Sequence, residues 1–217
     1  MITVAKSAGF CFGVSRAVET VEKAAAQDPC VVTLGPIIHN RHVVEKFDAM
    51  GIRVINSPDE AEPNMTVIIR SHGVSRAVQE QLQAKGVKII DATCPFVKRI
   101  HGIVEKAEEE GRLPVIIGTR AHPEVEGIAG WCKDCRVFET PEELVEWANS
   151  GEISANSPIC MVSQTTSTES LWKNSVQFAG IVHQRHFFTV FTANHRKAAC
   201  VGTFRVSYND HGFTFLT

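Results

Sequence analysis

The sequence predicts an α/β fold made of two similar parallel-sheet lobes, with helices on the faces of each sheet. Two patterns support this prediction. Short runs of β-branched and aliphatic residues recur along the chain, and segments with apolar residues at helical spacing follow several of them. The length of 217 residues and a hydrophobic content of 44% suit one large globular domain or two small ones.

Composition narrows the classes of function. The formal net charge of -2 shows no basic excess, so we expect no nucleic-acid partner. No apolar run is long enough to cross a bilayer, and the first residues lack the layout of a signal peptide. We therefore expect a cytoplasmic protein without a membrane partner. Its seven cysteines, an odd number, are then more typical of metal ligands or reduced thiols than of disulfides.

The first half of the chain shows repeated strand–turn–helix units. Strand-like runs or strands with their turns are expected over 2–4, 31–38, 51–55, 65–70 and 87–90, and helices over 15–26, 43–50 and 75–85. Val14, Val18, Val21 and Ala25 form the expected inner stripe of the first helix. Ser75 is the expected N-cap of the third.

The pattern repeats after a long helix that begins at Pro95. Strands are expected over 113–118, 136–138 and 157–162, and Thr140 followed by Pro141 predicts a capped helix start. We divide the chain into a first lobe over 1–96, a second over 97–179 and an atypical tail over 180–217. In the tail, the sequence pattern predicts only one strand, over 187–192.

Cys94 and Cys11 stand at comparable places in this pattern. Each follows a strand-like run and precedes a helix, and Pro95 suits the first turn of the second of these helices. Unpaired N–H groups and the helix dipole at such a position favour a thiolate, which binds metals and electrophiles. Gly9 and Gly13 flank Cys11 and allow a close approach of the backbone.

Other polar residues follow strands at the same expected sheet edge. They are His39, His72, His122 with Glu124, and Thr165 with Thr166. Ligands bind at this edge of parallel sheets. A lone histidine is more often structural, but several imidazoles with hydroxyls suit a phosphate or diphosphate, and two thiolates suit a soft metal or an iron–sulfur cluster. A carboxyl beside an imidazole suits a proton donor, and the residues alone leave Glu124 and Glu126 as alternatives.

Six segments together resemble the 4-hydroxy-3-methylbut-2-enyl diphosphate reductase family of LytB type, from residue 1 to about 178. They are Gly9-Phe-Cys-Phe-Gly-Val, Ile38-His-Asn-Arg, Ser71-His-Gly-Val-Ser, Asp91-Ala-Thr-Cys-Pro, His122-Pro-Glu-Val-Glu-Gly and Ser163-Gln-Thr-Thr. The resemblance implies three α/β lobes around a [4Fe-4S] cluster and reduction of the substrate to isopentenyl and dimethylallyl diphosphate. It also implies a ferredoxin or flavodoxin as electron donor.

Site roles follow from the resemblance residue by residue. Cys11 and Cys94 match two of the three cluster ligands. His39, His72, His122 and Thr165 match substrate-binding positions, and Glu124 matches the proton donor.

The third lobe of the family and its cluster cysteine have no counterpart in the tail. From Ile181 onward the chain holds six of its twelve phenylalanines and a single acidic residue, a composition unlike the rest. We interpret the tail as a frameshifted or otherwise aberrant translation that replaces the third lobe. The competing interpretation is a natural variant in which Cys200 serves as the third ligand. On the first interpretation we expect a weak or inactive reductase.

Two other functions stay open from the residues alone: a non-redox phosphate-binding α/β module, and a zinc-dependent hydrolase using Cys11, Cys94 and a histidine. The pair Cys132 and Cys135 is interpreted as two incidental loop thiols. We expect Cys30 and Cys160 in the core, and His42 and His101 as packing or surface residues.

Overall fold

The fold comes from a computed structural model of the 217-residue chain. It describes residues 8–154, 157–182, 188–191, 201–209 and 212–216, so the strand expected over 2–4 lies outside the described residues. The chain divides into two compact units, Met1–Lys98 and Arg99–Thr217. Among the described residues, none of the helices combines the length and the apolar character that crossing a bilayer needs.

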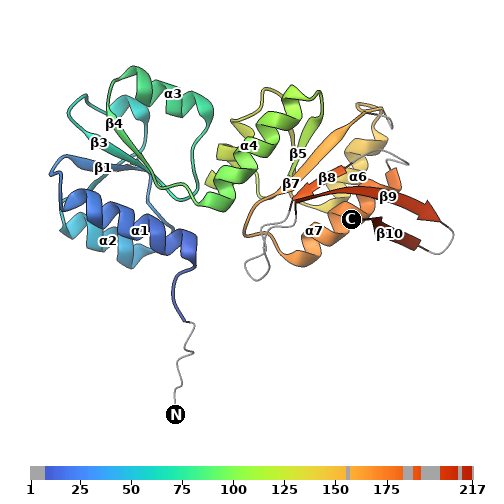
Figure 1. The fold of residues 1–217 in the computed structure, drawn as a ribbon, viewed down its shortest axis with the longest axis horizontal. Helices are drawn as coiled ribbons and strands as arrows, with labels where there is room; N and C mark the ends of the chain where they lie inside the picture. The colour runs from blue at the N-terminus through green and yellow to red at the C-terminus, as the bar shows by residue number, and fades with distance from the viewer. Residues whose placement is uncertain (1–7, 155–156, 183–187, 192–200, 210–211, 217) are drawn as a thin grey trace, which may run out of the picture. The chain divides into compact units, whose positions relative to one another are not determined.

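Unit 1 is built on a four-stranded parallel sheet, and each strand is followed by a helix or a turn. The strands are β1 (Val31–Leu34), β2 (Arg53–Ile55), β3 (Thr66–Ile69) and β4 (Lys88–Asp91), in the order β2-β1-β3-β4. The helices are α1 (Phe12–Ala25), α2 (Arg41–Ala49) and α3 (Arg76–Ala84), with a short 3-10 turn, η1 (Pro58–Glu60). Figure 1 shows α1 and α2 on one side of this sheet and α3 on the other.

The two faces of the first sheet follow from side-chain alternation along its strands. In β3, Ile68 packs with buried residues of α1 and α2, whereas Val67 and Ile69 pack with Leu82 of α3. The sheet is thus apolar on both faces, which explains the continuous apolar runs in the sequence. In α1 the buried residues are Gly13, Ala17, Val21 and Ala24; the predicted stripe is therefore right for Val21, while its other three members are only partly buried.

Unit 2 repeats the arrangement, with α4 (Pro95–Glu109) leading into it from unit 1. Its parallel strands are β5 (Leu113–Ile117), β6 (Arg136–Phe138), β7 (Ile159–Ser163) and β8 (Phe188–Phe191). Its further helices are α5 (Pro123–Ala129), α6 (Pro141–Asn149) and α7 (Glu169–Val182). Helices α4 and α5 pack on one face, and α6 and α7 on the other.

The strands of the tail extend the second sheet. Strand β8 pairs with β7 in parallel and matches the one strand predicted there. Strands β9 (Val201–Asn209) and β10 (Gly212–Leu216) were not predicted from the sequence pattern, and they add antiparallel pairs, giving the order β10-β9-β8-β7-β5-β6 (Figure 1). The predicted α/β class with two mainly parallel sheets is confirmed.

Side-chain caps fix the starts of three helices, two of them at the predicted cap residue. Ser75 accepts a hydrogen bond from Val78 N, and Thr140 accepts one from Glu143 N, so both predicted caps are confirmed. Asn40 caps α2 in the same way, so this helix starts at Arg41, two residues earlier than predicted. Each cap fixes where the helix begins after the turn that follows its strand.

Candidate functional site

Three strand-to-helix turns of unit 1 are tied to one another by backbone hydrogen bonds. The backbone N–H of Cys94, after β4, donates to Ser71 O, after β3, at 2.9 Å. Ser71 in turn donates to Ile37 O, after β1, from its N–H at 3.2 Å and from its hydroxyl at 2.9 Å. The parallel register of β1, β3 and β4 puts these turns at the same edge of the sheet.

The thiol of Cys94 packs directly against the first turn of α1. A Cβ atom added at Gly13 would lie 2.5 Å from Cys94 Sγ, closer than real Cβ contacts allow. Arg16, one turn further along α1, donates from Nη1 to Thr93 O at 3.0 Å. The expected close approach at Gly13 is therefore present, whereas a Cβ at Gly9 would meet nothing within 4 Å among the described residues.

Cys11 is the N-cap residue of α1 and is exposed. Its side chain accepts no capping hydrogen bond, so the sulfur is not used to satisfy the helix backbone. Cys94 is half-buried and directly precedes α4, whose first residue is Pro95. Both predicted ligand cysteines thus stand at helix starts, where the dipole favours negative charge, and Cys94 lies against the helix that Cys11 begins.

Asp91 shapes the turn that carries Cys94. Its carboxylate accepts from Thr93 N at 2.9 Å and from Lys98 Nζ at 2.6 Å. Burial opposes the charged form, but the bonds from Lys98 and Thr93 outweigh it and lower the pKa of Asp91. The charged carboxylate therefore holds the turn from β4 into α4 at neutral pH.

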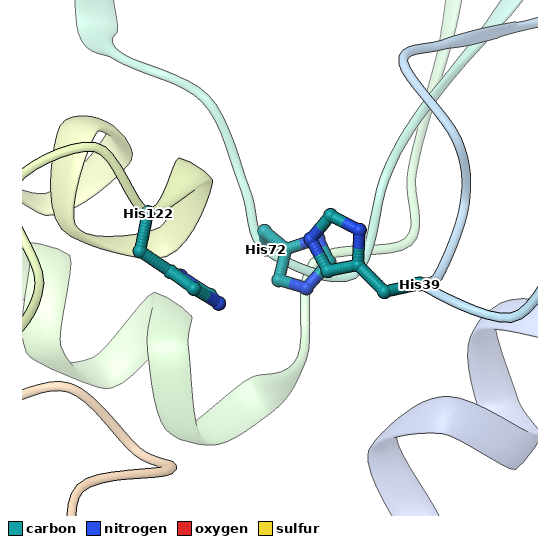
Figure 2. A group of neighbouring side chains, drawn as sticks. All are labelled: His39, His72 and His122. Atoms are coloured by element: carbon teal, nitrogen blue, oxygen red, sulfur yellow. The ribbon is translucent and has the colours of Figure 1, made fainter.

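His39 and His72 lie side by side in unit 1. Their ring centroids are 4.6 Å apart with an angle of 39° between the planes, and Figure 2 shows the two rings next to each other. His39 is exposed and His72 is half-buried. Within unit 1, the structure thus brings together the two histidines that the sequence singled out there, in an arrangement that suits two donors to one anion.

In unit 2, a buried carboxyl is held by the turn after β7. Glu124 is 2% exposed. Its Oε1 accepts from Thr165 N at 2.6 Å and its Oε2 accepts from Thr165 Oγ1 at 2.8 Å. Burial raises the pKa of Glu124, and the two bonds from Thr165 oppose that rise without cancelling it. A carboxyl with a raised pKa keeps a proton that it can donate.

His122 is the N-cap of α5, the helix whose first turn carries Glu124 (Figure 2). Its Nδ1 accepts a hydrogen bond from Glu124 N at 3.1 Å. In the neutral ring this assigns the proton to Nε2, which makes Nε2 a hydrogen-bond donor. Glu126, the alternative carboxyl in the same motif, is exposed, so burial distinguishes the two.

The turn after β5, which carries His122, packs closely against the turn after β7, which carries Thr165. Gly118 and Gln164 make this contact. A Cβ at Gly118 would lie 2.8 Å from Gln164 Cβ and 2.9 Å from Val125 Cγ2. Gln164 Oε1 accepts from Thr119 N at 3.2 Å. This packing fixes the distance between the turn after β5 and the turn after β7, and therefore the Glu124–Thr165 pair.

Sequence reasoning missed two of the residues that position the site. Arg16 was not singled out. An arginine in the first turns of a helix is common, and its position in the sequence does not indicate which acceptor it binds. Gln164 belongs to a quoted motif, but its side-chain contact with the β5–α5 turn depends on strand pairing, which sequence spacing does not show.

The other cysteines and histidines singled out in the sequence lie in different environments. Cys160 is buried as predicted, and burial raises the pKa of its thiol to about 11. The prediction for Cys30 is wrong: it is exposed, because it lies in the polar turn before β1, where its N–H bonds Asp28. His42 is on the surface, and His101 is buried with its ring stacked on another aromatic ring, both within the prediction.

Among the described residues, Cys11 and Cys94 are the cysteines at the positions that the resemblance assigns to cluster ligands. Cys200, the candidate for a third ligand, lies outside the described residues. Sulfur donors that lie at helix starts and are not engaged in a disulfide fit an iron–sulfur group, which thiolates hold.

The proteins that this chain matches belong to the family that the six motifs resemble. The profile of the LytB protein family matches residues 2–197, beyond the last motif quoted above. The chain is 43% identical over 185 residues to a 4-hydroxy-3-methylbut-2-enyl diphosphate reductase of Caldanaerobacter subterraneus, covering 81% of this chain and 61% of that protein. It is 38% identical over 172 residues to the corresponding reductase of Clostridioides difficile, covering 79% and 61%. The chain thus spans about three fifths of the length of these relatives.

Two solved structures share the fold. One is described as (E)-4-hydroxy-3-methyl-but-2-enyl diphosphate reductase, the terminal enzyme of the non-mevalonate pathway, with a TM-score of 0.74, 36% identity, and coverage of 88% of this chain and 67% of that one. The other is E-1-hydroxy-2-methyl-but-2-enyl-4-diphosphate reductase from Plasmodium falciparum, with a TM-score of 0.74, 28% identity, and coverage of 81% and 55%.

Proposed function

Because the chain belongs to the LytB protein family, we propose that it carries the site of a 4-hydroxy-3-methylbut-2-enyl diphosphate reductase. In that reaction two electrons and two protons remove the substrate hydroxyl as water, and isopentenyl or dimethylallyl diphosphate is formed. The observation that carries the proposal is the packing of Cys94 Sγ against the helix that Cys11 begins. Two thiols of one unit are therefore available to bind one metal group.

Cys11 and Cys94 would hold a [4Fe-4S] cluster, which when bound supplies the reducing electrons and Lewis acidity toward the hydroxyl oxygen. The electrons would come from a ferredoxin or flavodoxin. The pairing of Cys94 N with Ser71 O and of Arg16 with Thr93 O holds the Cys94 turn in place before any metal binds. A site that is already organised loses less conformational entropy on binding its ligand.

His39 and His72 would bind the diphosphate. Their rings are held close by the hydrogen bonds that Ser71 makes to Ile37 O, because these bonds join the segments that carry the two histidines. Two imidazole donors offset part of the negative charge of the diphosphate. By the family resemblance, His122 would donate to the substrate through Nε2, since its Nδ1 already accepts from Glu124 N.

Glu124 would supply a proton, and Thr165 would pass it on. The carboxyl is buried and its pKa is raised, so it holds its proton more tightly than an exposed glutamate does. Thr165 is half-buried, and its hydroxyl lies 2.8 Å from Glu124 Oε2. A hydroxyl both donates and accepts, so Thr165 Oγ1 can accept the proton of Glu124 while it releases its own to the substrate.

Anaerobic reconstitution of the full chain with iron and sulfide tests the proposal. We expect a brown protein whose iron and labile sulfide content falls in Cys11→Ser and in Cys94→Ser. Cys30→Ser is the matched control, because Cys30 is also exposed but precedes a strand. Product formation is then measured with a chemical reductant, so that the result does not depend on the electron-donor protein. Turnover compared with that of the Caldanaerobacter reductase tests the expectation that this chain is a weak or inactive reductase.

Two results would replace the proposal with another function. A colourless protein that retains zinc through Cys11 and Cys94 would favour the hydrolase. A colourless and metal-free protein that still binds inorganic pyrophosphate would favour a phosphate-binding module, which the closeness of His39 and His72 would serve equally well.

A further inference from the structure

Two cysteines outside the proposed site lie together in the loop between α5 and β6. Cys132 and Cys135 are both half-buried and both reduced. Cys132 Sγ donates to Ala129 O, at the end of α5, at 3.4 Å, and the two thiols are close enough for each to shift the pKa of the other. Neither residue matches a motif of the family resemblance, so the proposed function does not use them.

The loop around the two thiols is held by hydrogen bonds and packing. Glu108 of α4 accepts two backbone N–H groups through Oε1, from Lys133 at 2.6 Å and from Asp134 at 3.1 Å. These are the two residues between the cysteines. The cysteine side chains also pack against the buried cluster under α4 and α5. Both the backbone between the two cysteines and their side chains are therefore held by contacts within the fold.

The thiols differ in their electrostatics. The neighbouring Cys132 thiol lowers the pKa of Cys135, with a further contribution from the positive charge of Arg136, against burial and the negative charges of Asp134 and Glu108. The neighbouring Cys135 thiol, together with burial, raises the pKa of Cys132. One thiol of the pair is thus suited to react as a thiolate and the other to remain a thiol until the second step.

We propose that Cys132 and Cys135 form a thiol–disulfide exchange site that reacts with low-molecular-weight disulfides. Cys135 Sγ attacks one sulfur of the small disulfide, forms a mixed disulfide, and releases one thiolate. Cys132 Sγ then loses its proton and attacks Cys135 Sγ, forming the intramolecular disulfide and releasing the second thiolate. The protein is oxidised by two electrons, and the small disulfide is reduced to two thiols.

A metal site is the less fitting use of this pair. Tetrahedral metals need three or four protein donors. Within the described part of the chain, no group of three or more potential metal-binding side chains includes either cysteine. Two neighbouring thiols that are three residues apart, and that belong to no such group among the described residues, suit exchange chemistry.

Titration of the full chain with glutathione and glutathione disulfide tests this proposal. After anaerobic incubation, free thiols are alkylated and the peptides are analysed by mass. We expect one peptide lighter by two hydrogens that contains both cysteines, while circular dichroism stays native. Cys132→Ser should instead keep a glutathione adduct on Cys135. Cys30→Ser should leave the pair unchanged, because Cys30 is an exposed thiol in the turn before β1 of unit 1.

Brief alkylation of the reduced protein tests the assigned order of attack. Cys135 should be modified about tenfold faster than Cys132, because the thiolate is the reactive form. Trp131 gives a second readout: it adjoins Cys132 and stacks on His101 with ring centroids 5.2 Å apart. Disulfide formation should change the indole fluorescence, and Trp131→Phe should remove that change.

Three results would overturn the proposal. One is a stable glutathione adduct in the unsubstituted chain without closure to Cys132. Another is a disulfide that joins either cysteine to a different one, and the third is oxidation only after circular dichroism shows unfolding. Because both cysteines lie outside the proposed reductase site, these results are independent of iron binding and substrate turnover.

Discussion

Thr165 donates both its backbone N–H and its hydroxyl to the buried carboxyl of Glu124, at 2.6 Å and 2.8 Å. The two residues are brought together by the parallel pairing of β5 with β7, which sets the turn after one strand beside the turn after the other. Burial raises the pKa of this carboxyl, and the two hydrogen bonds from Thr165 limit that rise. This balance makes the pair sensitive to small changes, which leads to the first two predictions.

Glu124→Gln should change how stability depends on pH. Because burial raises the pKa of Glu124 in the folded state, the folded chain holds a proton that the unfolded chain releases above a pH of about 4.3. Stability therefore falls as pH rises from there through the folded-state pKa, by about 1.4 kcal/mol for each unit of the difference. Denaturant unfolding at several pH values should show this decline in the parent chain and its loss in the variant.

Glu126→Gln is the matched control for that experiment. Glu126 lies on the same helix and in the same motif, but it is exposed. Its replacement should leave the decline in stability with pH as it is in the parent chain. An identical pH profile for Glu124→Gln and the parent chain would contradict the assignment of the decline to Glu124.

Thr165→Val should weaken the hydrogen bonding between residue 165 and Glu124 while keeping the shape of the side chain. It removes the hydroxyl that pairs with Glu124 Oε2 and leaves the backbone bond to Oε1. Loss of one partner of a buried polar group costs about 1–3 kcal/mol. The lost bond had lowered the pKa of Glu124, so that pKa should rise further. Unfolding experiments should show lower stability and a pH-dependent decline that extends to higher pH, and Thr165→Ser should restore both toward the parent values.

Gly13→Ala should disrupt the Cys94 turn even though alanine is the better helix former. The new Cβ would lie 2.5 Å from Cys94 Sγ, so the thiol or the helix must move. We expect a loss of stability of about 1–3 kcal/mol, as for overpacking in a filled interior, and weaker iron binding after reconstitution.

Gly102→Ala should stabilise the protein, in contrast to Gly13→Ala. Gly102 is also within a helix, α4, but a Cβ there meets nothing within 4 Å among the described residues. Its replacement should raise stability by about 0.5–1 kcal/mol and leave iron binding unchanged. Equal effects of the two substitutions on iron content would show that the packing at Gly13 does not position Cys94.

His39→Ala and His72→Ala should each weaken binding of inorganic pyrophosphate. A hydrogen bond to a charged group contributes about 1.5–3 kcal/mol, so each loss should raise Kd roughly tenfold or more. His42→Ala is the control, because the His42 side chain is 93% exposed on α2 and lies beside Glu45. Isothermal titration calorimetry checks all three, and unchanged affinity in both site variants would remove the two histidines from the proposed anion site.

Much of the fold could be predicted because its determinants are local. Strand runs, the Ser75 and Thr140 caps and the start of α4 at Pro95 depend on residues within one or two turns of each other. Parallel strands joined by helices then place the turns after the strands at one edge of each sheet. The sequence by itself therefore determined the α/β class and which residues follow each strand.

Only the tertiary structure decided which of those residues are buried, paired or crowded. Glu124 and Glu126 are equivalent in the sequence, and burial distinguishes them because α5 turns one side toward the sheet. Gly13 meets Cys94 across 81 positions of chain, and Cys30 is exposed although an apolar strand follows it. These outcomes depend on contacts between distant segments, and such contacts form only when the sheets assemble.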